Sequence, residues 1–285
     1  LEGDDVNHQA LRQMDAADYH ASDAVSNSML SSLKDSPAHC WAMHLNPDRP
    51  EREPTAAMRL GTLTHTAILE PDQVRHRYSI KPSDLNLNSN AGKEWKSAMV
   101  GLEIITADEL LMVEEQRKAV QANDELRAIL SSGHAEQSVF ATDKATGLRI
   151  KCRPDWLQFV GPNRVKVFDL KTTADITLDA VSRSIDSFGY HRQQAHYTRV
   201  LEAAGLIVDD FIFGFVTKSY PFFAIPYRID DESLAQGFEE VGELLSLYSH
   251  CLRENKWPLS GSGVPTVGLP RWARRETEIE VSYAT

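Results

Sequence analysis

Apolar residues recur every three or four positions in several parts of the chain, which is the spacing of one face of an α-helix. Ser26 and Asn27 are typical cap residues at the first of these segments, and Pro71 ends the second. Residues 71–101 carry turn formers without a sustained period, so we expect a loop-rich insertion there. The predicted helices are 26–35, 58–70, 106–131, 178–204 and 230–255.

Short segments rich in β-branched and aromatic residues begin at residue 136. Such segments, separated by Gly, Pro and Asn turns, are typical of β-strands. We expect the first three to form antiparallel strands, so that the third makes a hairpin with the second. The predicted strands are 136–143, 148–160, 164–173, 209–219 and 222–229.

Helices and strands in this order predict a mixed α/β fold with a central mixed sheet, from about 136 to 228, flanked by helices. We expect a single domain over 1–285. Its parts are a mainly helical decoration at 18–135, a core at 136–255 and a tail at 256–285.

Composition narrows the class of protein. With 42% hydrophobic and 25% charged residues, the chain is typical of a globular protein. It lacks both a long apolar run that could span a bilayer and the pattern of a signal peptide, so we expect a cytoplasmic protein without a membrane partner. Cys40, Cys152 and Cys251 are far apart, which argues against a zinc site, a disulfide framework and an iron–sulfur cluster.

The informative motif is Pro154-Asp155 followed, after thirteen residues, by Asp169-Leu170-Lys171. Asp169 and Lys171 share one face of a strand, because side chains alternate with period two. The hairpin brings Asp155 beside them. Two nearby carboxylates repel each other and need a cation, and oxygen ligands favour Mg²⁺, for which Mn²⁺ can substitute. The Leu170 carbonyl is a further candidate ligand.

Lys171 is the candidate that would orient a bound water or accept its proton, since burial can depress the pKa of a lysine. The alternative is structural: Asp155 lies in a turn, and Asp169 and Lys171 form a surface ion pair worth well under ~1 kcal/mol. A D-x-K triplet by itself often arises by chance, so companion residues have to decide.

Two further motifs flank the acidic strands. Gly61 to His65 reads G-x-x-x-H on a predicted helix, and Gln193 to Tyr197 reads Q-x-x-x-Y on another. With the acidic motif, they resemble the RecE exonuclease family and the RecB-like and lambda-exonuclease-like branch of the PD-(D/E)XK nucleases. The likeness covers roughly residues 18–275. It departs from the common pattern at Asp169, where Glu is more usual.

This resemblance implies roles for the residues that match. His65, Asp155 and Asp169 are implied as metal ligands, with Glu136 as a weaker acidic candidate near the metals. Asp155, Asp169 and Lys171 are implied as catalytic, with Gln193 and Tyr197 supporting the nucleophile or the DNA backbone. The alternatives are a helix histidine and a core tyrosine. Ser26 and Ser28 match the S-x-S helix opening that holds a terminal phosphate in relatives, but an ordinary helix cap fits them equally well.

The resemblance also implies an activity: Mg²⁺-dependent, processive 5′-to-3′ degradation of linear double-stranded DNA, which leaves 3′ single-stranded tails for homologous recombination. It implies a homo-oligomeric ring, a tetramer by likeness, and a single-strand annealing partner of the RecT type. The alternatives are another PD-(D/E)XK DNA nuclease and a catalytically inactive DNA-binding relative.

A net charge of −11 argues against non-specific coating of DNA, because phosphate binding draws on a basic surface.

Overall fold

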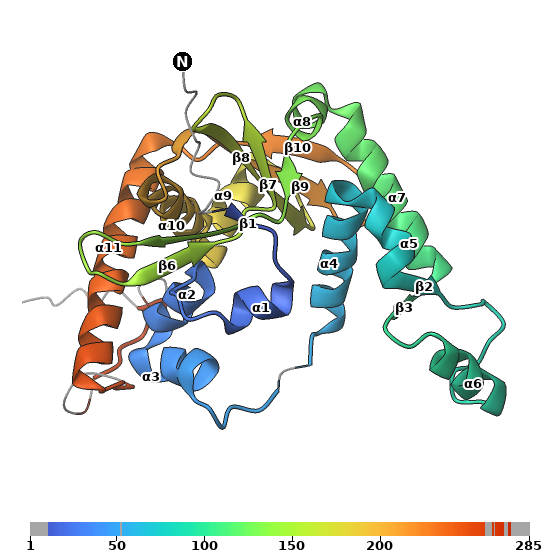
Figure 1. Ribbon diagram of the computed structural model, residues 1–285, viewed down its shortest axis with the longest axis horizontal. Helices are drawn as coiled ribbons and strands as arrows, with labels where there is room; N and C mark the ends of the chain where they lie inside the picture. Colours follow the sequence, from blue (N-terminus) through green and yellow to red (C-terminus); the bar gives the residue numbers. More distant parts are fainter. Residues whose placement is uncertain (1–10, 52, 260–263, 265, 271–272, 275–285) are drawn as a thin grey trace, which may run out of the picture.

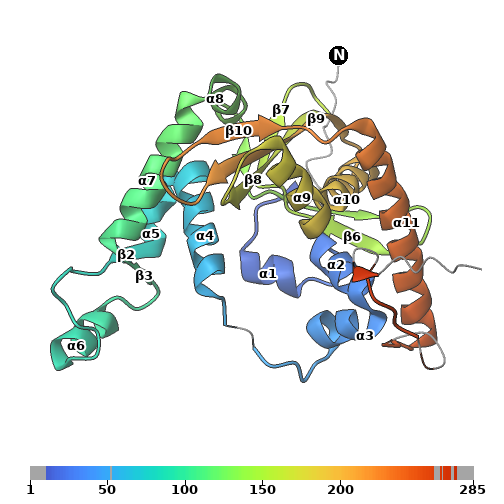
Figure 2. The ribbon, with the colours of Figure 1, turned by 180° about the vertical axis from the view of Figure 1, so that it is seen from behind.

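The computed structural model describes residues 11–51, 53–259, 264, 266–270 and 273–274 (Figure 1). Most of the predicted tail at 256–285 therefore lies outside the described residues. The described residues form one large mixed sheet, two smaller sheets and helices on both faces of the large one (Figures 1 and 2).

A five-stranded sheet lies at the centre, in the order β10-β9-β8-β7-β4. Its longest strands, β8 (Arg164–Thr173) and β9 (Ile207–Thr217), are parallel, and its other neighbouring strands are antiparallel. Because helices cover both faces, residues 167–170 of β8 and 211–217 of β9 are buried. The central mixed sheet predicted from the sequence is confirmed. The shorter strands are β4 (His134–Ala135), β7 (Trp156–Phe159) and β10 (Ala224–Tyr227).

A smaller sheet has the order β1-β5-β6. The single strand predicted for 148–160 is wrong, since this segment divides into β6 and β7, which belong to different sheets. Pro154 lies between them and has no N–H to donate to a ladder. Asp155 therefore lies where the chain passes from one sheet to the other. The strands of the smaller sheet are β1 (Leu11–Arg12), β5 (Ser138–Thr142) and β6 (Arg149–Cys152).

The larger part of the core lies between the central sheet and three helices, α2 (Asn27–Asp35), α10 (Tyr190–Ala203) and α11 (Asp231–Glu254) (Figure 2). Phe213 and Phe215 of β9 are buried in this cluster. The single helix predicted for 178–204 is wrong. The segment forms α9 (Leu178–Phe188) and α10, because Gly189 takes a left-handed φ of 67°.

The opposite face of the sheet is covered by α4 (Ala56–Leu69), α7 (Ala107–Ala122) and α8 (Asp124–Leu130), with Phe168 and Leu170 buried beneath them. The helix predicted for 106–131 is likewise two helices. Asn123 has an extended backbone, and its side chain caps α8 by accepting the N–H of Leu126.

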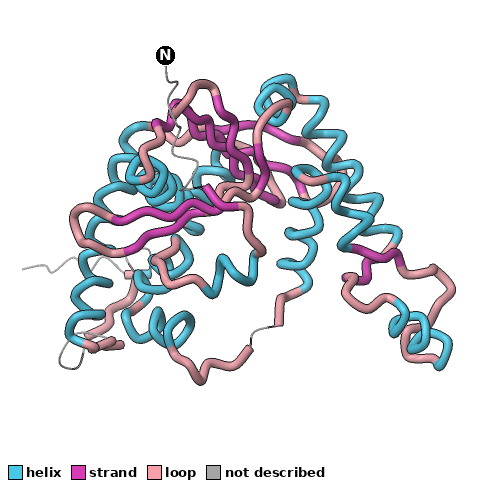
Figure 3. Tube along the Cα trace, viewed as in Figure 1, coloured by secondary structure: helices cyan, strands magenta, loops and turns pink. Residues whose placement is uncertain are grey.

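An arm projects from this side of the molecule, with α6 at its tip (Figures 1 and 3). The loop-rich insertion predicted for 71–101 is wrong in part, since the arm holds a short helix between two parallel strands. Its elements are η3 (Pro71–Gln73), α5 (Val74–Arg77), β2 (Tyr78–Ile80), α6 (Asn90–Ala98) and β3 (Glu103–Ile105). Near the N-terminus lie α1 (Ala16–Ala21), α3 (Pro37–Cys40) and the π-helix η2 (Trp41–Leu45).

Candidate active site

Asp169 and Lys171 lie on the face of β8 that is directed at α10, as their alternate positions predict. Their side chains form an ion pair, and Gln193 of α10 joins both. Gln193 Oε1 accepts from Lys171 Nζ at 2.9 Å, and Gln193 Nε2 donates to Asp169 Oδ2 at 2.7 Å. Asp169 is only 1% exposed. This burial excludes the solvated surface pair that the sequence left open.

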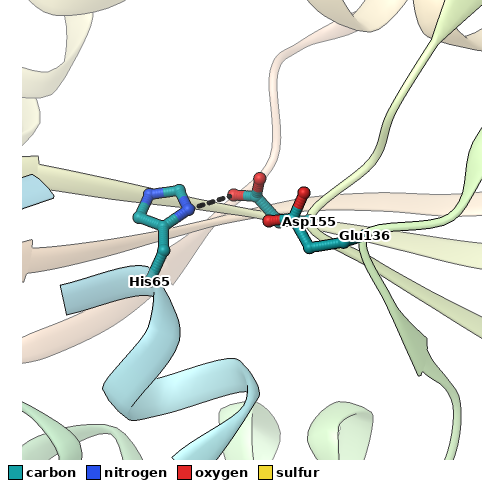
Figure 4. A group of neighbouring side chains, drawn as sticks. All are labelled: His65, Glu136 and Asp155. Carbon is teal, nitrogen blue, oxygen red and sulfur yellow. Dashed lines mark ion pairs between the residues drawn. The ribbon is translucent and has the colours of Figure 1, made fainter. Parts of the chain in front are cut away.

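Asp155 enters the site immediately before β7. Its Oδ2 accepts the backbone N–H of Leu170 at 2.6 Å and lies 3.4 Å from Nδ1 of His65. In a strand, the N–H and the carbonyl of one residue point to the same edge. The Leu170 carbonyl therefore lies on the edge of β8 that Asp155 approaches. His65 comes from α4, and Figure 4 shows its ring directed at the Asp155 carboxylate.

Glu136 completes a cluster with His65 and Asp155, in which one ligand atom from each residue lies within 4.8 Å of the others (Figure 4). Glu136 has a φ of 54°, which is uncommon for a residue with a side chain, and its N–H donates to the Asp155 carbonyl. Backbone strain of this kind often accompanies functional sites. Two carboxylates and an imidazole fit a divalent cation such as Mg²⁺ or Mn²⁺.

Burial raises the pKa of the Glu136 carboxyl to about 7, and the nearby charge of Asp155 adds to this effect. Burial also raises the pKa of Asp169 to about 6; Lys171 opposes this shift, and Asp155 reinforces it. The pKa of Asp155 is lowered, because His65 and Lys171 outweigh its burial. The three carboxyls thus compete to ionise, which is the electrostatic condition that a bound cation relieves.

The two bases of the site hold their protons. Burial alone would lower the pKa of His65, but the Asp155 carboxylate raises it to about 9. Burial would also lower the pKa of Lys171, yet Asp169 and Asp155 raise it. The expectation of a depressed pKa at Lys171 is therefore wrong, because the two carboxylates outweigh the effect of burial. In the metal-free protein Lys171 is therefore an ammonium at neutral pH, which is the form that can orient a group or donate a hydrogen bond.

Ser26 and Ser28 line a cavity of about 290 Å³ next to the acidic cluster. Ser26 caps α2, and its Oγ lies 2.9 Å from Oγ of Ser28. Arg153 enters this cavity between β6 and β7. Its Nε donates to Glu136 at 2.8 Å, while its buried Nη1 has no hydrogen-bond partner in the described part of the chain. The lining side chains include Tyr19, Ser26, Ser28, Glu136, Arg153 and Tyr197.

Tyr197 lies one turn after Gln193 on α10, where its partly buried ring packs against the larger core. Its hydroxyl donates to the carbonyl of Arg153 at 3.4 Å. The structure therefore gives Tyr197 the position of a support beneath the cavity rather than a direct contact with Asp169 or Lys171.

A protein-family model described as "PDDEXK-like domain of unknown function (DUF3799)" matches residues 26–264. The chain belongs to this family. The matched region contains the site residues Ser26 to Tyr197 described above. Membership in the PDDEXK-like family and the sheet topology confirm the fold class predicted from the sequence.

Among solved structures, the chain is similar to a protein of Eubacterium rectale described as a putative exonuclease. The TM-score is 0.60 and the identity 16%, over 86% of this chain and 88% of that chain. It is also matched to a phage-related exonuclease of Haemophilus somnus, with a TM-score of 0.33 and 14% identity over 80% of this chain and 95% of that one. The first likeness supports the fold of the PDDEXK-like family. No curated protein matches the sequence.

None of the helices in the described part of the chain combines the length and the hydrophobicity needed to cross a bilayer.

Arg153 and Tyr190 were not identified from the sequence. Arg153 directly precedes the Pro154-Asp155 motif, and a basic residue at that place is a signal that could be used. Tyr190 stands three residues before Gln193, hence on the same face of α10, and its ring centroid lies 4.6 Å from Lys171 Nζ.

Proposed function

We propose that the protein is a Mg²⁺-dependent exodeoxyribonuclease that degrades linear double-stranded DNA processively from 5′ ends. Its 3′ single-stranded tails would serve homologous recombination. The observation that carries this proposal is the convergence of His65, Glu136 and Asp155 beside the bonded group of Asp169, Gln193 and Lys171. The PDDEXK-like family and the similarity to a protein described as a putative exonuclease support it.

In this proposal, His65, Glu136, Asp155, Asp169 and the Leu170 carbonyl hold Mg²⁺, for which Mn²⁺ can substitute. When bound, the cation neutralises charge that develops on the phosphate and lowers the pKa of an attacking water.

The side chains around the proposed metal ligands stabilise the phosphate and position the charged groups. The Lys171 ammonium, held by Asp169 and by Gln193 Oε1, stabilises the negative charge on the phosphate. Gln193 fixes the geometry of both charged partners, because its amide both donates and accepts.

The cavity beside the metal ligands is proposed to receive the 5′-terminal phosphate. The N-terminus of α2, capped by Ser26, favours an anion. Ser28 offers a hydroxyl, and the unpaired Nη1 of Arg153 offers a charged donor. This pocket gives a physical basis for starting at a 5′ end, because it is built next to the acidic cluster.

A homo-oligomeric ring, a tetramer by family likeness, and a single-strand annealing protein of the RecT type belong to the same proposal. The alternative functions are those of another DNA nuclease of the PD-(D/E)XK group and of a catalytically inactive DNA-binding relative. The presence of Asp155, Asp169 and Lys171 in one bonded site disfavours the inactive relative.

The test uses linear duplex DNA labelled at the 5′ or the 3′ end, with Mg²⁺ or with a chelator. We expect rapid loss of the 5′ label, later loss of the 3′ label and no loss with chelator. A duplex that lacks 5′ phosphates should be degraded more slowly. The variant Asp169→Asn, which keeps the shape of the side chain, should be inactive. Degradation that ignores the chelator or begins at 3′ ends would reject the proposed reaction or its polarity.

A further inference from the structure

A stack of aromatic rings runs from the surface into the core beside the candidate active site. Phe188 stacks on Tyr190 with centroids 5.6 Å apart and planes inclined by 24°. Tyr190 stacks on Phe213 at 5.7 Å and 25°, and Phe213 packs on Phe211 at 5.0 Å. The rings come from the end of α9, the start of α10 and the strand β9.

This stack passes directly by the catalytic ammonium. Lys171 Nζ lies 4.6 Å from the centroid of Tyr190 and 5.7 Å from that of Phe213. Phe211 and Phe213 are buried, whereas Phe188 is 65% exposed. The outermost ring therefore presents apolar surface to solvent one ring away from the group that is proposed to hold the scissile phosphate.

The corner that carries Phe188 is firmly built. The next residue, Gly189, has a φ of 67°, and a Cβ there would lie 2.1 Å from the Arg192 guanidinium. Arg192 in turn is buried and donates to Glu240 of α11 at 2.8 Å. The backbone at Phe188 is thus fixed by the turn at Gly189 and by the partly buried ion pair of Arg192, so little backbone freedom is lost when a ligand packs on the ring.

We propose that Phe188 is a stacking platform for one base of an unpaired DNA strand whose phosphate lies at Lys171. The proposal rests on the nuclease function proposed above. Aromatic side chains bind single strands by stacking on bases, and this contact is independent of sequence because every base has a π face. That property suits an enzyme that must pass over any sequence. Bases within a duplex are stacked on each other, so the occupant is an unpaired terminal nucleotide.

The position of the ring beside a cationic group favours a nucleotide over a protein partner. The platform is continuous, through Tyr190, with the cationic group that binds the phosphate. In a nucleotide, a flat aromatic base and an anionic phosphate are joined at short range, which matches a ring beside an ammonium. A second copy of the chain packing on Phe188 is the alternative that the experiment has to distinguish.

The experiment is a thermodynamic cycle between the ring and the base. Binding of a short single-stranded oligodeoxynucleotide is measured by fluorescence anisotropy in the inactive Asp169→Asn protein, with the dye at the 3′ end. Phe188→Ala is compared with Phe188→Trp and with the control Leu178→Ala, an apolar residue of the same helix that is 73% exposed. Each protein is tested on the intact strand and on strands that lack one base near the 5′ end.

We expect Phe188→Ala to weaken binding of the intact strand about 5- to 150-fold, the range measured for one base on one aromatic ring. The loss should disappear on the strand that lacks the stacked base, because both changes remove the same contact. Phe188→Trp should bind the intact strand as tightly as the Asp169→Asn protein without a second change, or more tightly. Leu178→Ala should bind it as tightly as that protein.

Equal losses on intact and base-deleted strands, or binding by Phe188→Ala that matches Leu178→Ala, would overturn the platform. A change in mass by light scattering for Phe188→Ala, without a base-dependent loss, would assign the ring to a protein interface instead. The two proposals fail separately. A wild-type protein that degrades no DNA rejects the nuclease, whereas an active wild type with an unaffected Phe188→Ala rejects the platform alone.

Discussion

Burial alone would lower the pKa of Lys171, but Asp169 and Asp155 raise it, so the side chain keeps its charge. We predict that Lys171→Ala lowers the rate of DNA degradation by about 10²–10³-fold or more, the usual effect of losing a preorganised charge at the reacting group. Lys166→Ala, on the same strand but outside the bonded group, is the matched control and should retain activity. Initial rates with melting curves for both variants make the test. A Lys171→Ala enzyme of near-normal rate would remove this residue from the mechanism.

Protons would compete with the proposed metal for the same ligands. A group whose pKa is higher in the folded protein than in the unfolded chain stabilises the fold at low pH, and this contribution is lost as pH rises through the folded value. The pKa values of Asp169, Glu136 and His65 are raised to about 6, 7 and 9. The metal-free protein should therefore lose this contribution between about pH 4 and 9, and a cation should restore it.

The rise in Tm produced by Mn²⁺ should accordingly grow as pH increases from about 6, where Asp169 titrates, to about 9, where His65 does. Each pH unit below the pKa of a ligand costs about tenfold in affinity at that ligand. Calorimetric titration in buffers of different ionisation enthalpy should also detect proton release on binding. The His65→Ala variant should show weaker binding and release fewer protons. A shift in Tm that is independent of pH would contradict this account.

At the residue scale, the sequence could predict the neighbours that local spacing determines. Asp169 and Lys171 share a face because a strand alternates, and the hairpin predicts the approach of Asp155. Spacing could not reveal the partner that sets the charge of each group, because these partners come from other elements. Glu136 and Arg153 meet across a change of sheet, so only the fold brings them together.

Helices were predicted where apolar periodicity is sustained, and their existence is confirmed, but two of them contain breaks. The spacing of apolar residues continues through Asn123 and Gly189. It therefore does not show that the helix ends there and that a second helix begins. The causes are single residues: Asn123 also donates to the Ala224 carbonyl at 3.4 Å, and Gly189 permits a left-handed turn. The helix α6 of the arm escaped prediction because Gly92 is its one buried residue, which leaves no buried apolar stripe to detect.

The corner between α9 and α10 should depend on Gly189. We predict that Gly189→Ala destabilises the protein by about 1–3 kcal/mol, since an L-residue at positive φ costs about 1–2 kcal/mol and the added Cβ must also displace Arg192. Chemical denaturation of both proteins measures the free energy of unfolding. The control is Gly147→Ala, also at positive φ but with open space around its Cβ, which should cost only the backbone share. Equal losses in the free energy of unfolding for the two variants would show that Arg192 moves aside at little energetic cost.

At the scale of the whole molecule, the acidic excess restricts how DNA can be held. A net charge of −11 repels a polyanion on average, so binding must rely on a limited positive lining and on the metal. Near the proposed phosphate positions, the side chains of Arg153 and Lys171 are both largely buried, and each is paired on one side with a carboxylate. These cations suit local capture of a phosphate better than tight binding along a duplex.

A closed ring of subunits would reconcile weak electrostatic attraction with processive degradation, because an enzyme threaded on its substrate need not bind tightly to remain there. We predict that the protein is a stable oligomer in solution by light scattering. A plasmid cut once should be degraded in Mg²⁺, while the same plasmid, covalently closed or nicked, should resist because it offers no end to thread. The cut and closed forms have the same sequence and length, so they differ only in topology. A monomeric mass at the working concentration, or efficient cutting of closed circles, would remove the ring, while the roles of Asp155, Asp169 and Lys171 would still be tested by their own variants.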